Sequence, residues 1–135
     1  MNVVAKKSLG QNFLIDEKIL NLIVGLGDIN SNDIVLEVGP GTGNLTEKIL
    51  KKGPKKIIVV EKDANLSMNL KKKFKKDIIV INDDILSYNQ SYLYKKKIII
   101  FGNLPYNIST QILTSWIKIN NLNNFCKKFI LMFQK

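Results

Sequence analysis

The stretch "DIVLEVGPGTGNLTEKIL", residues 33–50, joins an apolar run to a glycine-rich loop and then to an amphipathic segment. Residues 33–39 are almost continuously apolar, which is typical of a strand buried on both faces of a parallel sheet. Residues 44–52 have the apolar periodicity of a helix with one buried face. A strand that turns through glycines into a helix is the repeating unit of α/β proteins, so this stretch predicts the fold class.

Four further apolar runs predict more strands of the same kind. They are rich in β-branched residues, are bounded by lysines or turn residues, and cover residues 56–61, 77–83, 97–103 and 128–133. Amphipathic segments predict helices at 16–26, 64–76 and 109–120, the last of them after the cap candidates Ser109 and Thr110. The alternation predicts a doubly wound α/β fold with a mostly parallel sheet and right-handed crossovers, formed by residues 1–135 as one domain.

The charge of the chain narrows the choice of partner. The formal net charge is +10, and all 21 basic residues are lysines. This surplus favours a polyanionic partner such as nucleic acid, because neutralised phosphates release counterions, although a merely solvated surface would account for the same lysines. The lysine clusters at 70–77, 94–98 and 126–128 are interpreted as solvated helix ends, with dedicated binding sites as the alternative.

Residue types that are absent or rare exclude several functions. The chain has no histidine, and its one cysteine, Cys126, cannot form an internal disulfide, so histidine-based catalysis and most zinc sites are excluded. No apolar stretch approaches the roughly 20 residues that cross a bilayer. The N-terminus does not resemble a signal peptide. We therefore expect a cytoplasmic protein that does not contact a membrane.

Ligands of such sheets bind beyond the carboxyl ends of the strands, so the residues that follow each strand are candidates. Gly39, Gly41 and Gly43 follow the first strand, where they permit a sharp turn and a close approach by a ligand. Counted from either Gly39 or Gly41, the sixth position is not the glycine that a dinucleotide loop requires, and Pro40 lacks an N–H donor. A cofactor without phosphates, such as S-adenosylmethionine, fits better than a nicotinamide dinucleotide.

Acidic residues follow the second and third strands. Glu61 lies eighteen positions beyond the last loop glycine, where an acid can accept hydrogen bonds from ribose hydroxyls. The alternative is an ordinary strand-end carboxylate paired with Lys62. Asp84 can accept from the exocyclic amine of the cofactor's adenine while Ile85 packs on the ring. Alternatively, Asp83 or Asp84 caps a helix or a turn.

The stretch "FGNLPYNIST", residues 101–110, follows the fourth strand and predicts a clamp for an aromatic amine. The side-chain oxygen of Asn103 and a backbone carbonyl of Leu104 or Pro105 can accept the two amine hydrogens and direct the nitrogen lone pair at an electrophile. Pro105 fixes its own φ and restricts the residue before it. Tyr106 offers a flat face on which a base can stack, worth about 1–3 kcal/mol. The alternative is a proline-containing turn with an exposed tyrosine.

These motifs resemble those of the ribosomal RNA adenine N6-dimethyltransferases, a family of class I S-adenosylmethionine-dependent methyltransferases. The resemblance rests on "KSLGQNFL" (7–14), "EVGPGTGNLT" (37–46), "VVEKD" (59–63), "NDDIL" (82–86), "GNLPYNIS" (102–109) and "MFQK" (132–135). It implies a Rossmann-like fold and cofactor contacts at Asn12, Leu14, Gly39, Glu61, Asp84 and Asn103. It also implies transfer of two methyl groups to N6 of each of two adjacent adenines near the 3′ end of small-subunit rRNA, without a metal ion.

The resemblance further implies a partner and a larger chain. The partner would be small-subunit rRNA or the pre-ribosomal small subunit, in ribosome biogenesis. Family members continue into further strands and a helical C-terminal domain, so we expect residues 1–135 to form an incomplete cofactor-binding domain with five of the usual seven strands. We expect a monomer. The alternatives are methylation of another amine, in DNA adenine or protein glutamine, and a non-catalytic RNA-binding assembly factor.

Overall fold

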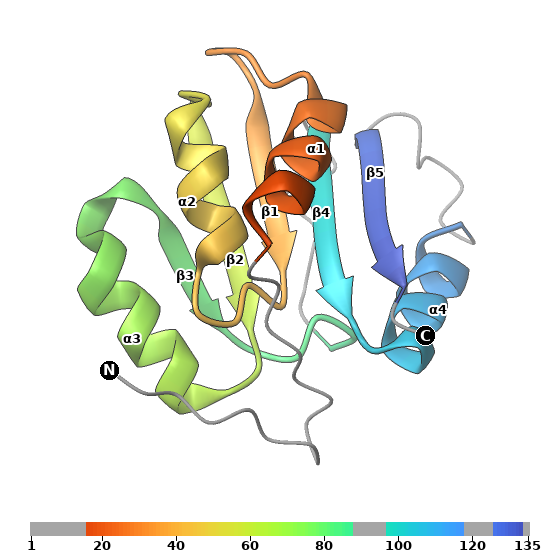
Figure 1. Cartoon of the computed structure of the whole chain (residues 1–135). Helices are drawn as coiled ribbons and strands as arrows, with labels where there is room; N and C mark the ends of the chain where they lie inside the picture. The colour runs from red at the N-terminus through yellow and green to blue at the C-terminus, as the bar shows by residue number, and fades with distance from the viewer. Residues whose placement is uncertain (1–15, 88–96, 118–125, 134–135) are drawn as a thin grey trace.

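The computed structural model describes residues 16–87, 97–117 and 126–133 of the chain. Its centre is a five-stranded sheet in which all neighbouring strands are parallel and follow the order β3-β2-β1-β4-β5 (Figure 1). The strands are β1 (Ile34–Val38), β2 (Lys56–Glu61), β3 (Ile79–Asn82), β4 (Ile98–Leu104) and β5 (Cys126–Phe133). The order reverses between β1 and β4, which confirms the prediction of a doubly wound parallel sheet.

Helices cover both faces of the sheet. The α-helices are α1 (Glu17–Gly27), α2 (Asn44–Lys51), α3 (Ala64–Phe74) and α4 (Tyr106–Ile117), and a short 3-10 turn, η2 (Lys75–Asp77), follows α3. Apolar side chains of α1, α2 and α3 pack with one set of alternating strand residues, on the side facing the viewer in Figure 1. Ile112 of α4 packs with the other set. Because both faces are covered, the strands are largely apolar, as the sequence predicted.

The start of α4 differs from the prediction. The helix begins at Tyr106, directly after Pro105, whereas the cap candidates placed its start after Ser109. The carbonyl of Pro105 accepts the N–H groups of Ile108 and Ser109, at 3.1 and 3.0 Å. The fixed φ of proline is compatible with a helix start, so β4 passes into α4 with almost no loop. Ser109 therefore lies inside the first turn, and Tyr106 belongs to a helix.

No helix in the described parts of the chain combines the length and the hydropathy needed to cross a membrane.

Candidate functional site

The carboxyl ends of three neighbouring strands bring the predicted site residues together. The register of β1 with β2 and β4 places Gly39, the residue after β1, between Glu61 and Asn103. A Cβ atom added at Gly39 would lie 2.4 Å from Cδ2 of Leu104 and 3.5 Å from the carbonyl oxygen of Asn103. The pairing of β2 with β3 extends the row to Asn82. Gly39, Glu61 and Asn103 thus lie side by side at one edge of the sheet.

The glycine loop is shaped by its own hydrogen bonds. Its glycines all have positive φ, at +67° for Gly39, +60° for Gly41 and +89° for Gly43, a region that other residues rarely adopt. Each of them donates its N–H within the protein: Gly39 to Val60 O at 2.9 Å, Gly41 to a Glu61 carboxylate oxygen at 3.1 Å, and Gly43 to Pro40 O at 3.0 Å. The three glycine donors are therefore occupied, which makes the loop a poor cradle for pyrophosphate.

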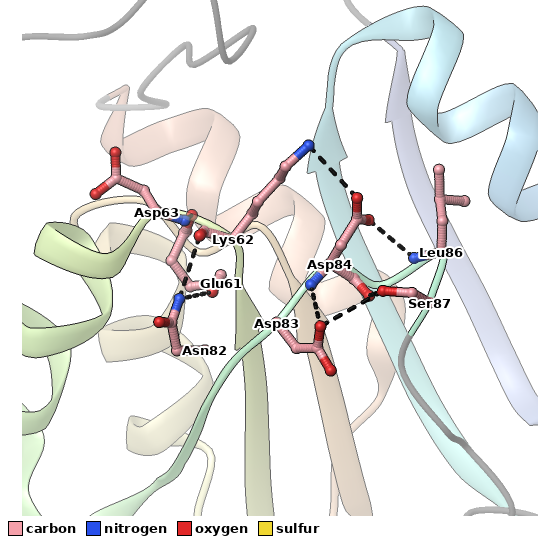
Figure 2. Close-up of polar contacts among 8 residues, drawn as sticks. All are labelled: Glu61, Lys62, Asp63, Asn82, Asp83, Asp84, Leu86 and Ser87. Carbon is pink, nitrogen blue, oxygen red and sulfur yellow. Dashed lines mark hydrogen bonds and ion pairs between the residues drawn. The ribbon is translucent and has the colours of Figure 1, made fainter.

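Glu61 is held from two sides at the end of β2. Its Oε2 accepts the N–H of Gly41, and its Oε1 accepts the N–H of Asp63 at 3.0 Å. The side chain is buried, and burial raises the pKa of Glu61 although both hydrogen bonds oppose the shift. An ionised carboxylate has about four acceptor positions, so each oxygen keeps capacity for a ligand donor. The alternative pairing with Lys62 is wrong, because the Lys62 ammonium lies 3.4 Å from Oδ2 of Asp84 instead (Figure 2).

The two aspartates after β3 shape a turn, as the alternative interpretation held. Oδ1 of Asp83 accepts the N–H of Asp84 at 2.7 Å, and Oδ1 of Asp84 accepts the N–H of Leu86 at 3.0 Å (Figure 2). Ile85, between Asp84 and Leu86, is buried on the face of the sheet that α4 covers. These contacts leave Oδ2 of Asp84 directed at Lys62, beside the end of β2. The role of Asp84 and Ile85 in holding adenine stays a prediction.

The end of β4 carries the predicted amine clamp. Asn103, Leu104 and Pro105 are half-buried. Because the Pro105 carbonyl already accepts two N–H groups of α4, both of its lone pairs are occupied. The Leu104 carbonyl has the Ser109 hydroxyl at 3.5 Å, so it is the better candidate for the second acceptor. Tyr106 is the first residue of α4, and its side chain lies outside the described part, as do the predicted cofactor residues Asn12 and Leu14.

A buried acid inside β1 was not among the predicted site residues. Glu37 is 2% exposed, and its Oε2 accepts the hydroxyl hydrogen of Thr46 at 2.5 Å. Burial raises the pKa of Glu37 to about 7, and the nearby charge of Glu61 acts in the same direction. Because Glu37 precedes the glycine loop and Thr46 follows it, this bond joins the two ends of the loop. A lone acid within an otherwise apolar strand is the signal that could have identified it.

Asn82 is a second residue that sequence patterns did not single out. Its side-chain amide donates to the carbonyl oxygens of Glu61 and Lys62, at 2.9 and 3.2 Å, and so connects the ends of β2 and β3 (Figure 2). Within the described residues, no group of histidine, cysteine, aspartate and glutamate side chains could hold a metal ion.

Comparison with known proteins decides the family. The model of the ribosomal RNA adenine dimethylase family matches residues 2–135. The chain belongs to this family. Among members of the ribosomal RNA adenine dimethylase family, ribosomal RNA small subunit methyltransferase A of Pelagibacter ubique is 56% identical, over 100% of this chain and 51% of its own length. The chain therefore spans about half the length of that relative.

Solved structures agree with this assignment. A dimethyladenosine transferase from Plasmodium falciparum matches with a TM-score of 0.76 and 32% identity, over 92% of this chain and 44% of that one. The 23S rRNA methyltransferase ErmE matches with a TM-score of 0.78 and 25% identity, over 91% and 48%. Family and structures together confirm the predicted class I methyltransferase fold and the resemblance drawn from the sequence motifs.

Proposed function

We propose that this chain carries the cofactor- and adenine-binding domain of an S-adenosylmethionine-dependent rRNA adenine N6-dimethyltransferase that acts on small-subunit rRNA. The observation that carries the proposal is the row at the sheet edge, in which Gly39 lies between Glu61 and Asn103. A carboxylate that suits a ribose and an amide that suits an aromatic amine flank a loop that both ligands can approach closely.

The donors and acceptors of the site support S-adenosylmethionine as the cofactor. Glu61, Asp84 and Asn103 offer acceptor oxygens, while the glycine N–H groups are occupied inside the protein. An adenosine without phosphates supplies ribose hydroxyls and an exocyclic amine, which are the donors such a site requires. When bound, the cofactor would supply a methyl group on a sulfonium, an electrophile that needs no further activation. Asn12 and Leu14 are proposed as additional contacts from the family resemblance alone.

The chain's own part in the reaction is to position the target base. The Asn103 side-chain oxygen and the Leu104 carbonyl accept the hydrogens of the adenine N6 amine, and this directs its lone pair at the methyl group. Pro105 makes the carbonyl rigid, and Tyr106 is proposed to stack on the extruded base. Positioning of this kind can contribute about 7–11 kcal/mol to lowering a barrier. Each transfer is followed by loss of one N6 proton to solvent, so a monomethylated amine keeps one hydrogen, and the clamp must accept a rotated product before the second transfer.

The relatives support the choice of substrate and target. The names of the Pelagibacter and Plasmodium proteins support ribosomal RNA and adenine as substrate and target. Small-subunit rRNA, free or within a pre-ribosomal particle, is thus favoured over DNA adenine and protein glutamine. A monomer in the cytoplasm is proposed from the sequence alone.

Methyl transfer from labelled cofactor tests the proposal. The chain is incubated with labelled S-adenosylmethionine and, separately, small-subunit rRNA, duplex DNA or bulk protein. We expect label in rRNA alone, recovered after digestion as N6,N6-dimethyladenosine. Label in DNA or protein alone would contradict the substrate, and no heat of binding with either S-adenosylmethionine or S-adenosylhomocysteine would favour the non-catalytic RNA-binding factor.

A further inference from the structure

Lysines gather at the edge of the sheet that lies opposite the candidate site. In Figure 1 the strands begin at the top, while the site residues follow their lower ends. Lysines precede or open four of the strands, and we call them the amino-edge lysines: Lys51, Lys52, Lys55 and Lys56 at β2, Lys75 and Lys76 at β3, Lys97 at β4, and Lys127 and Lys128 at β5. In sequence these are separate clusters, and only the fold brings them to one edge.

The strand register makes this edge continuous. Ile34 at the start of β1 pairs with Lys56 of β2 and with Ile98 of β4, which follows Lys97. Just before β1, Asp33 accepts the backbone N–H of Lys55 at 2.8 Å through its carbonyl and the ammonium of Lys127 at 3.0 Å through its carboxylate. The backbone of Lys55, just before β2, and the side chain of Lys127 in β5 therefore meet at one buried aspartate.

The positive charge of this edge is largely unbalanced. All amino-edge lysines except Lys128 are exposed. Within the described residues, the ion pair between Lys127 and Asp33 is the only one that an amino-edge lysine makes. The other ion pairs there are Lys48–Glu17, Lys62–Asp84 and Lys73–Glu47. Asp28, Asp33 and Asp77 lie at the same edge, so the lysines outnumber the carboxylates there. Exposed ammonium groups in such an excess attract polyanions by releasing counterions from phosphates.

Among the described residues, the opposite edge is mainly acidic. Carboxylates of Glu61, Asp63, Asp83 and Asp84 follow β2 and β3 there, and Lys62 pairs with Asp84. An RNA that presents a base at this edge is repelled by these groups, and screening confines any attraction to about 8–10 Å at ordinary salt. The six residues of β2 separate the two edges by about 20 Å. Attraction for phosphates must therefore act on a different part of the RNA.

We propose that the amino-edge lysines form a second RNA contact surface, which binds the phosphate backbone of an rRNA segment other than the one that carries the target adenines. This inference rests on the proposed function, since it takes rRNA as the partner. Lysine acts on phosphate as a point charge, so the surface contributes affinity and orientation and does not read base sequence. It would let the enzyme select a folded RNA over a short fragment with the same adenines.

Salt-dependent binding of two charge-matched variants tests the surface. The test variant is Lys52→Gln/Lys55→Gln/Lys56→Gln, and the control is Lys18→Gln/Lys71→Gln/Lys72→Gln, whose exposed lysines lie on α1 and α3. For small-subunit rRNA we expect the slope of log Kd against log salt to fall by about 2 to 3 in the test variant, since each lost phosphate contact removes about 0.9. The control should keep the parent slope, and a short RNA hairpin with two adjacent adenines should bind all three proteins alike.

Enzyme assays separate this surface from the site. The test variant should keep its affinity for S-adenosylmethionine and its kcat at saturating rRNA, while its KM for rRNA rises about tenfold or more. An unchanged rRNA slope, an equal loss in the control, or salt-sensitive binding to anionic phospholipid vesicles in place of rRNA would each overturn the second surface. A parent chain that binds rRNA with the expected slope yet transfers no methyl group would overturn the proposed function and leave the surface standing.

Discussion

The backbone N–H of Gly41 donates to the carboxylate of Glu61 across 3.1 Å, and so ties the loop after β1 to the end of β2. The other carboxylate oxygen accepts the N–H of Asp63, so the side chain is fixed before any ligand arrives. Preorganisation of this kind lowers the entropic cost of ligand binding, because the side chain need not be ordered when the ligand arrives. The loop and the acid thus form one unit in which a change at either residue alters both.

Glu61→Gln should weaken cofactor binding while the protein remains folded. One carboxylate oxygen becomes an NH₂ group, which faces the N–H of Gly41 or Asp63 and cannot accept from a ribose hydroxyl. Loss of one charge-assisted hydrogen bond of about 1.5–3 kcal/mol predicts an affinity for S-adenosylmethionine that is lower by about 10- to 100-fold in calorimetry. Glu47→Gln, at an exposed acid, is the control. Equal affinity in the Glu61 variant and the parent would remove Glu61 from the site.

Gly39→Ala should abolish cofactor binding through a clash as well as through strain. Gly53→Ala is the matched control, because both glycines have φ of +67° but an added Cβ at Gly53 meets nothing within 4 Å. Each variant should lose about 1–2 kcal/mol of stability from the left-handed conformation, as measured by urea unfolding. Only at Gly39 does the new carbon lie 2.4 Å from Leu104, so only that variant should lose calorimetric cofactor binding. Similar binding in both variants would contradict this account.

Local sequence patterns predict the strands of this protein well because burial on both faces leaves a continuous apolar signal. Each predicted strand is present, and no strand end differs from the prediction by more than two residues. The predicted start of α4 was wrong for a local reason. Residues with a hydroxyl group favour helix caps, but Pro105 already supplies a compatible backbone angle and a carbonyl acceptor.

Pairings between distant residues were harder to predict, because they depend on the order and register of the strands. The choice of partner for Lys62 illustrates this. In sequence Glu61 is its neighbour, but a strand directs successive side chains to opposite faces, and β3 brings Asp84 to within 3.4 Å. Glu37 was missed because its significance lies in its burial and in Thr46, which only the turn of the glycine loop brings close.

Replacement of Glu37 should change how stability depends on pH. Its pKa of about 7 in the folded protein lies above the ordinary value of 4.5, so the folded state binds this proton more tightly than the unfolded state. The stability from this group is therefore fully present below pH 4.5 and is lost as pH rises through 7, on the order of 3 kcal/mol in total. The difference in unfolding free energy between the parent and Glu37→Gln should move by most of that amount between pH 5 and 8, in favour of the variant at high pH. Parallel pH profiles for the two proteins would count against the shifted pKa.

Asn103→Ala should separate methyl transfer from cofactor binding. The truncation removes the side-chain oxygen that we propose to hold the adenine amine, while Gly39, Glu61 and the loop hydrogen bonds stay in place. Cofactor affinity should therefore fall only a few-fold, whereas a lost positioning contact of about 3 kcal/mol should lower kcat on rRNA by about 100-fold or more. The exposed Asn107→Ala on α4 controls for loss of an amide near the same helix start. Single-turnover transfer at saturating cofactor and rRNA measures the effect, and a rate close to that of the parent would mean that another group holds the amine.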